Sequence, residues 1–460
     1  MLALRLTRSA HPAVQLRRLL VAAASAGTGF LMLSALGYAL GHPGEPAGSL
    51  LLRLAWCATP LAATVHLAVA VARTDPATAP RPGLSAVGLG PARLMAVSAT
   101  TTALATTLGS LLALLVFLHL RGDLTGLPFD GAADDFLAAG RPLPLPAALT
   151  LLAAIPVLAS LAVALTLRPR DPRTPSPGPR RRFGRFGAFG GPATRETFGA
   201  YGRFGARSGR PRAARVGPGH TAPAPAAPQP PDGVPAPGDA VPDAERPPQD
   251  EAARTAPPAP RPAPTTLPWG IATLAAGLAV EAYAGRTGTP GDLTMPGGLT
   301  TGPAGVLLGW ALTAVGLALA GPGLTHLCGR LLQSARPGAL RLLAGRALMA
   351  EADRIGRPLG VVCAVASAAY ALDGLRDPAA LGPLTALGAL VVAGCAVATL
   401  LTAAVECRQS RSGTTAALLR LGAPATVLRG AAALRAGALL ALFGPLTLLV
   451  AALAAQPLGR

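Results

Sequence analysis

Long apolar runs constrain this chain more than any other feature of its sequence. A helix that crosses the hydrocarbon core of a bilayer needs about 20 apolar residues, and nine runs near that length contain few charges. The seventh is the shortest, because Arg357 and Asp373 bracket it, and a buried or re-entrant helix is the alternative there. The sequence therefore predicts an all-α integral membrane protein with about nine transmembrane helices. The runs cover residues 19 to 40, 50 to 72, 94 to 119, 146 to 167, 268 to 285, 303 to 321, 358 to 372, 383 to 405 and 432 to 455.

The composition fits a chain whose main solvent is lipid. Charged residues make up only 13% of the sequence, about half the share in soluble proteins. All 40 basic residues are arginine. A Walker A loop and Schiff-base catalysis both need lysine, so the chain encodes neither. The five cysteines and six histidines form no metal-ligand or redox motif. We expect no catalytic residue, no metal, no cofactor and no enzymatic activity.

Arginines in the predicted loops indicate how the chain is oriented. Cytoplasmic loops of membrane proteins carry an excess of basic residues. If the N-terminus is inside, nine spans make the loops alternate between the two sides of the membrane. Every inside loop is then rich in arginine, and every outside loop holds mainly acids. We therefore predict a protein of the cell membrane with a cytoplasmic N-terminus and an extracytoplasmic C-terminus. The outside acids are Glu45, Asp123, Asp130, Asp134, Asp135, Asp292, Asp373 and Asp377.

Residues 168 to 266 interrupt the spans with a long cytoplasmic linker rich in proline and glycine. Such a composition cannot bury enough apolar area to offset the entropy of ordering, so the sequence predicts disorder. Between 168 and 215, thirteen arginines against two acids give a net charge of +11, interleaved with aromatic residues. This half could bind single-stranded nucleic acid or the anionic inner leaflet. Because the linker directly follows a span, we favour anionic lipid or solvated disorder over nucleic acid.

The two ends of the chain share an ordered pattern. VAAASA at 21 to 26 recurs as VCAVASA at 362 to 368, each preceded by arginines and followed by two spans joined through a short outside loop. Six spans separate the starts of the copies, so the copies would be parallel, like transporter halves related by an axis along the membrane normal. The predicted units are a first repeat of four spans at 1–167, the linker at 168–266, two linking spans at 267–335 and a second repeat of three spans at 336–460.

One segment of each predicted repeat resembles a known family. The run from Thr414 to Ala423 (TTAALLRLGA) and the weaker copy at 84 to 94 (LSAVGLGPARL) are similar to the loop after the second helix in FtsX-like permeases. These are membrane subunits of ABC systems of the MacB and lipoprotein-release types. The resemblance implies an inside coupling helix that rests on a separate ATPase subunit and moves the spans. It therefore implies a permease coupled to an ABC ATPase in trans through 73–93 and 406–431.

The resemblance also indicates which residues would touch the ATPase. A leucine would dock in an apolar groove, the glycine would let the helix turn, and arginines would meet acidic partner residues. The alternative is that the arginines are cytoplasmic retention charges and that Leu-Gly is a helix end. The positions are Leu89, Gly90, Arg93, Arg420, Leu421, Gly422 and Arg429.

The chain departs from this family in three ways. The acidic residue usual upstream of the Leu-Leu-Arg run is absent, which weakens the case for ATPase coupling. The large extracytoplasmic domain is reduced to short loops, and the second repeat lacks its fourth helix. A second reading is therefore a degenerate, non-transporting membrane scaffold whose basic linker recruits partners or anionic lipid.

Glu281 is the strongest candidate for a polar site inside the membrane. Burying an ionisable side chain in a bilayer is costly, so such residues are functional suspects. Glu281 lies near the end of the predicted span 268 to 285, where it could instead extend to the membrane surface.

Overall fold

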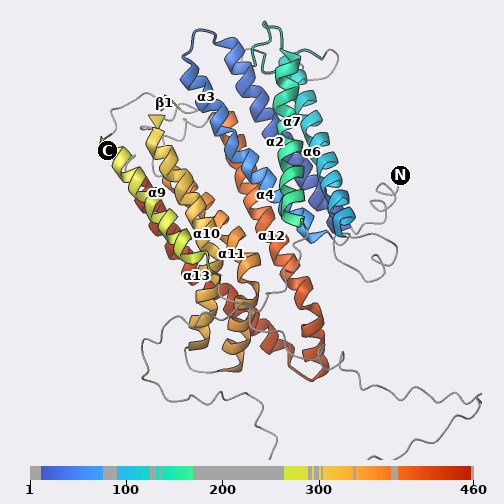
Figure 1. Ribbon diagram of the computed structural model, residues 1–460, viewed down its shortest axis with the longest axis vertical. Coiled ribbons are helices and arrows are strands. Elements are labelled where there is room, and N and C mark those ends of the chain that lie inside the picture. The colour runs from blue at the N-terminus through green and yellow to red at the C-terminus, as the bar shows by residue number, and fades with distance from the viewer. Residues whose placement is uncertain are drawn as a thin grey trace, which may run out of the picture. The chain divides into compact units, whose positions relative to one another are not determined.

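The computed structural model describes residues 12–75, 91–124, 131–134, 137–168, 264–287, 293–294, 300–301, 304–334, 338–373 and 382–456. These residues are almost entirely helical (Figure 1). Eight of the helical segments are long and apolar enough to cross a membrane. The prediction of an all-α, multi-pass membrane protein is therefore confirmed at this level. Most of the predicted linker lies outside the described residues.

The helices of the first half match the first four predicted spans. The second span is built from two helices that meet at Cys57, three residues before Pro60, and together they count as one membrane-spanning segment. The helices are α2 (Pro12–Gly41), α3 (Ala47–Trp56), α4 (Ala58–Thr74), α6 (Pro91–Arg121) and α7 (Leu145–Leu167).

The second half contains longer helices. Four of them are among the eight membrane-length segments. Between the first two, Leu293 and Thr294 pair antiparallel with Thr301 and Thr300 as the short strands β1 and β2. The helices are α9 (Leu267–Thr287), α10 (Ala304–Ser334), α11 (Ala339–Asp373), α12 (Pro383–Arg420) and α13 (Ala425–Ala455).

The remaining predicted span, residues 358 to 372, lies in the second half of α11. It is helical as predicted, but α11 is not one of the eight segments. Its apolar stretch lies between Arg357 and Asp373, and the first half of the helix carries several charges. The predicted total of nine spans therefore depends on α11.

Polar contacts and small side chains join the helices of the first half. The Ser25 hydroxyl in α2 donates to the Thr106 carbonyl of α6 at 2.8 Å, and the Thr28 and Thr64 hydroxyls of α2 and α4 are 2.9 Å apart. The fully buried Phe117 of α6 lies in a cluster with residues of α2 and α7. Interhelical hydrogen bonds of this kind replace the hydrophobic driving force that helices lack in lipid.

Glycines bring α9, α10 and α11 unusually close together. A Cβ added at Gly316 of α10 would lie 2.4 Å from the Leu274 backbone nitrogen of α9. One added at Gly360 of α11 would lie 2.3 Å from the Leu317 carbonyl oxygen of α10. Small residues at helix interfaces let backbones approach in this way, so α10 is held on two sides.

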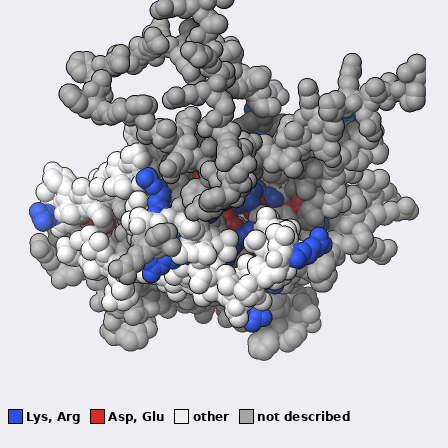
Figure 2. Space-filling view, turned by 90° about the horizontal axis from the view of Figure 1, so that it is seen from below, with Lys and Arg blue, Asp and Glu red and all other residues white. Residues whose placement is uncertain are grey.

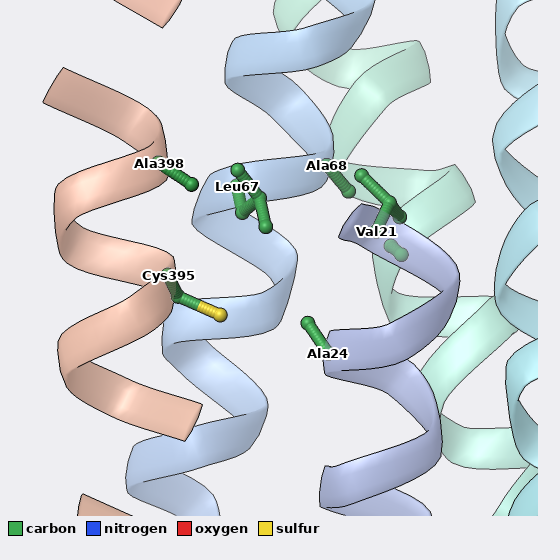
Figure 3. Packing of buried hydrophobic residues seen from close by; sticks show 7 residues of the cluster. Val21, Ala24, Leu67, Ala68, Cys395 and Ala398 are labelled. Carbon is green, nitrogen blue, oxygen red and sulfur yellow. The ribbon is translucent and has the colours of Figure 1, made fainter. Parts of the chain in front are cut away.

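Helix α12 connects the two halves. Its Cys395 and Ala398 share a buried cluster with Leu67 and Ala68 of α4 and with residues of α2 (Figure 3). Helix α12 also packs against α11, which in turn packs against α13. The second predicted span of the first half therefore meets the eighth span directly.

Replacing Gly316 with leucine should force α9 and α10 apart, because the new side chain would meet the α9 backbone. Overpacking of this kind costs about 1–3 kcal/mol. We expect the melting temperature of the purified protein in detergent to fall by several degrees. The matched control is Gly394→Leu in α12, where an added Cβ meets nothing within 4 Å. Equal melting temperatures for the two variants would contradict this account of the interface.

Candidate functional site

Four of the seven residues predicted to contact an ATPase lie at or beside the turn between α12 and α13: Arg420, Leu421 and Gly422 at the turn, and Arg429 within α13. Helix α12 ends at Arg420, and Gly422 has a φ of +84°. The amide of Gly422 donates to the Leu419 carbonyl at 3.0 Å, and that of Ala423 donates to the Leu418 carbonyl at 3.0 Å. This is the Schellman arrangement, which caps a helix with a left-handed residue. Leu-Gly is thus a helix end, as the alternative interpretation held.

The cap exposes the side chains around it. Leu421 is 83% exposed and Leu419 is 48% exposed. Arg420 and Arg429 are also exposed. The turn therefore presents two leucines flanked by arginines, which are the kinds of side chain expected for docking in an apolar groove with an acidic rim.

The turn between α12 and α13 lies beyond the ends of the first-half helices. Figure 1 shows it below the lower ends of α4, α6 and α7. With 38 residues, α12 is about 57 Å long, whereas the hydrocarbon core of a bilayer is about 30 Å thick. We call this end of the helices the inner end, because the orientation predicted from the sequence places it inside. Figure 2 views it from below and shows separate arginine side chains spread over it.

Two ion pairs join α11 to α12 near the inner end. Arg411 of α12 pairs with Glu351 of α11, whose side chain is buried. Arg354 of α11 approaches Glu406 of α12, with 3.6 Å between Nε and Oε1. Burial raises the pKa of Glu351, and the neighbouring Arg411 opposes that shift. Arg411 therefore favours the charged form of Glu351 and fixes α12 against α11 about two turns before the capped end.

The residues predicted in the first half are only partly described. Leu89 and Gly90 lie outside the described residues. Arg93 lies in the first turn of α6, where it is exposed. Helix α6 packs against α2 and α7, so Arg93 and the α12–α13 turn belong to different groups of helices.

Glu281 is buried between α9 and α10. It is only 1% exposed, so its side chain does not extend to the membrane surface. The Trp310 indole nitrogen donates to Glu281 Oε1 at 2.7 Å. Within the described part of the chain, Oε2 has no hydrogen-bond partner. Gly309 makes room, since a Cβ there would lie 2.7 Å from that of Glu281.

Neither the α11–α12 ion pairs nor the glycine contacts were predicted from the sequence. Glycines spaced seven apart in α9 and α10 were a readable signal: Gly270 with Gly277, and Gly309 with Gly316 and Gly323. The ion pairs left no such signal in the sequence, because Glu351 and Arg411 are 60 residues apart.

No family model, curated protein or solved structure matches this chain. The described residues also contain no group of three or more histidine, cysteine, aspartate or glutamate side chains that could hold a metal ion.

Replacing Arg411 with glutamine should destabilise the protein more than replacing Glu351 with glutamine. The first change leaves a buried carboxylate without its partner, which costs about 2 kcal/mol of the free energy of unfolding. The second removes the buried charge itself, and the double variant should recover most of the loss. Denaturant unfolding in detergent measures these differences. The control is Arg408→Gln, at an exposed neighbouring position. If Arg408→Gln lowered the free energy of unfolding as much as Arg411→Gln does, the stabilising role of the Arg411–Glu351 pair would be contradicted.

Replacing Glu281 with leucine should lower stability, because the Trp310 N–H would lose its acceptor inside the membrane. A buried donor without a partner costs about 1–3 kcal/mol. Glu281→Gln keeps a carbonyl oxygen for Trp310, so its melting temperature should stay near that of the wild type. Equal losses for both variants would show that the charge, and not the hydrogen bond, stabilises this contact.

Proposed function

We propose that this chain is the membrane subunit of an ABC-type transport or mechanotransmission system. It would lie in the cell membrane with nine spans, an inside N-terminus and an outside C-terminus. A separate ABC ATPase would engage the inner segments 73–93 and 406–431, as in FtsX-like permeases. The chain itself would bind no nucleotide and catalyse no reaction.

The α12–α13 turn is the observation that carries this proposal. It lies past the inner ends of the first-half helices, exposes Leu419 and Leu421 beside arginines, and continues directly into two membrane-length helices. The ion pairs between α11 and α12 connect the turn to a further helix, α11. A partner that displaced the turn would therefore move α11, α12 and α13 together. That is the property a coupling element needs.

Matching hydrogen bonds support the proposed duplication. In the first half, Ser25 of α2 donates to the carbonyl of Thr106 in α6, 81 residues away. In the second half, Ser367 of α11 donates to the carbonyl of Thr447 in α13 at 3.0 Å, 80 residues away. Ser25 and Ser367 are the serines of the two matched sequence segments. The same bond thus joins the first and third helices of both proposed repeats.

The packing between the halves also supports two parallel copies. The second helix of the first copy, α4, contacts the second helix of the other copy, α12. An axis along the membrane normal brings equivalent helices together in this way. Helices α9 and α10 would then be the linking pair, fixed to the second copy through the glycines of α10 and α11.

The absence of lysine from the sequence supports an external source of energy, because no Walker A loop can be formed. The inner end supplies basic and apolar side chains for a partner. The arginines of the turn would complement an acidic rim, and opposite charges at an interface mainly set specificity and association rate. The leucines would supply the buried contact.

Purification from the native membrane with a tagged chain tests the proposal. We expect a nucleotide-binding subunit to co-purify. Combined Leu421→Ser and Arg420→Glu changes should reduce its recovery at least about tenfold, the size of effect expected when a central interface residue is lost. The control is Arg346→Glu, an exposed arginine of α11 outside the proposed contact segments 73–93 and 406–431.

Two results would overturn the proposal. One is the absence of any nucleotide-binding subunit from the purified material. The other is equal recovery with the turn variant and with the control. Deleting residues 171–259 completes the test, because the permease function predicts that ATPase recovery survives, whereas a scaffold that recruits partners through its linker predicts that all partners are lost.

A further inference from the structure

A groove opens at the inner end between α11 and α13. Leu340 and Arg341 of α11 form one wall, and α13 forms the other with a run of mostly small residues from Gly430 to Ala441. Its volume is about 690 Å³, within the range of pockets that hold small molecules. Apart from Arg341 the lining side chains are all apolar, so an apolar occupant is favoured along most of its length.

The stretches of α11 and α13 that line the groove carry charges of one sign. The first twelve residues of α11 and all of α13 contain arginines but no aspartate or glutamate. Arg341 is exposed at the groove, and no carboxylate pairs with it among the residues described. In the sequence of α13, Arg429 directly precedes the run from Gly430 to Ala441, and Arg435 lies within it. An occupant with a negative group beside an apolar part would therefore complement the groove.

We propose that this groove binds one anionic phospholipid. An acyl chain would lie along the small residues of α13, and the phosphate would contact Arg341. Lipid is the molecule that surrounds a membrane-spanning helix such as α13, and anionic lipids are concentrated in the inner leaflet, where basic pockets between helices bind their headgroups. This site needs no partner protein, but Gly430 of its lining lies within the proposed ATPase-engaging segment 406–431, and its place in the inner leaflet rests on the proposed orientation.

Two substitutions separate the roles of charge and shape. Arg341→Gln removes the charge but leaves the apolar floor, and its control is Arg346→Gln, an exposed arginine of α11 that does not line the groove. Gly437→Leu fills the groove, and it should fold because an added Cβ there meets nothing within 4 Å. Gly394→Leu in α12 is its control for the same reason.

Native mass spectrometry of the purified full chain, titrated with phosphatidylglycerol or phosphatidylcholine, tests the site. We expect the wild type to retain one phosphatidylglycerol in preference to phosphatidylcholine. Arg341→Gln should weaken phosphatidylglycerol binding about fivefold and leave phosphatidylcholine unchanged, whereas Gly437→Leu should abolish the retained lipid. Both control variants should bind as the wild type does.

Three results would overturn the proposal: equal retention of the two lipids, equal effects of the Arg341 and Arg346 changes, or lipid retention by Gly437→Leu. Excess glycerol 3-phosphate distinguishes a lipid site from a phosphate site. It should not displace the bound lipid, because it has no acyl chain to fill the groove. Displacement would show that Arg341 binds phosphate alone.

Discussion

Backbone contact at glycine is the interaction on which the second half of this structure depends. In a bilayer, apolar side chains gain nothing by leaving lipid for one another, so helices associate through close packing and hydrogen bonds. Gly316 and Gly360 allow α10 to touch α9 and α11 along their backbones. This contact gives α11 a fixed neighbour on the side away from α12. The ion pairs therefore join α12 to a helix, α11, that is itself held in place by α10.

The helices of the two halves are held together by different interactions. In the first half, Ser25, Thr28 and Thr64 supply interhelical hydrogen bonds, and α7 adds a fourth helix. In the second half, α10 packs against α11, and α9 packs against α10. The first half thus presents a compact group of helices against α12, while the inner end of the second half extends beyond it. A displacement applied at that inner end would act across the α4–α12 contact.

Much of the fold could be predicted from the sequence, because span length and charge are local properties. Eight predicted spans coincide with membrane-length helices, and the ninth, residues 358 to 372, is the shortest of the predicted runs and lies between Arg357 and Asp373. The partner of Glu351 could not be predicted, since pairing across 60 residues depends on how α11 and α12 cross. The burial of Glu281 could not be predicted either, because its distance from the helix end does not show which face of α9 a neighbouring helix covers.

The helix-end and coupling interpretations of Leu421 and Gly422 were set against each other by the sequence, but the geometry makes them compatible. Gly422 adopts a positive φ, which a side chain at that position would oppose. The cap it forms ends α12 abruptly and leaves Leu421 with 83% of its surface exposed. A helix that continued through this point would place Leu421 on a regular helix surface, in contact with its neighbours one turn away. The structural role of the glycine is therefore the means by which an apolar side chain is displayed at the inner end, and a partner with an apolar groove would depend on it.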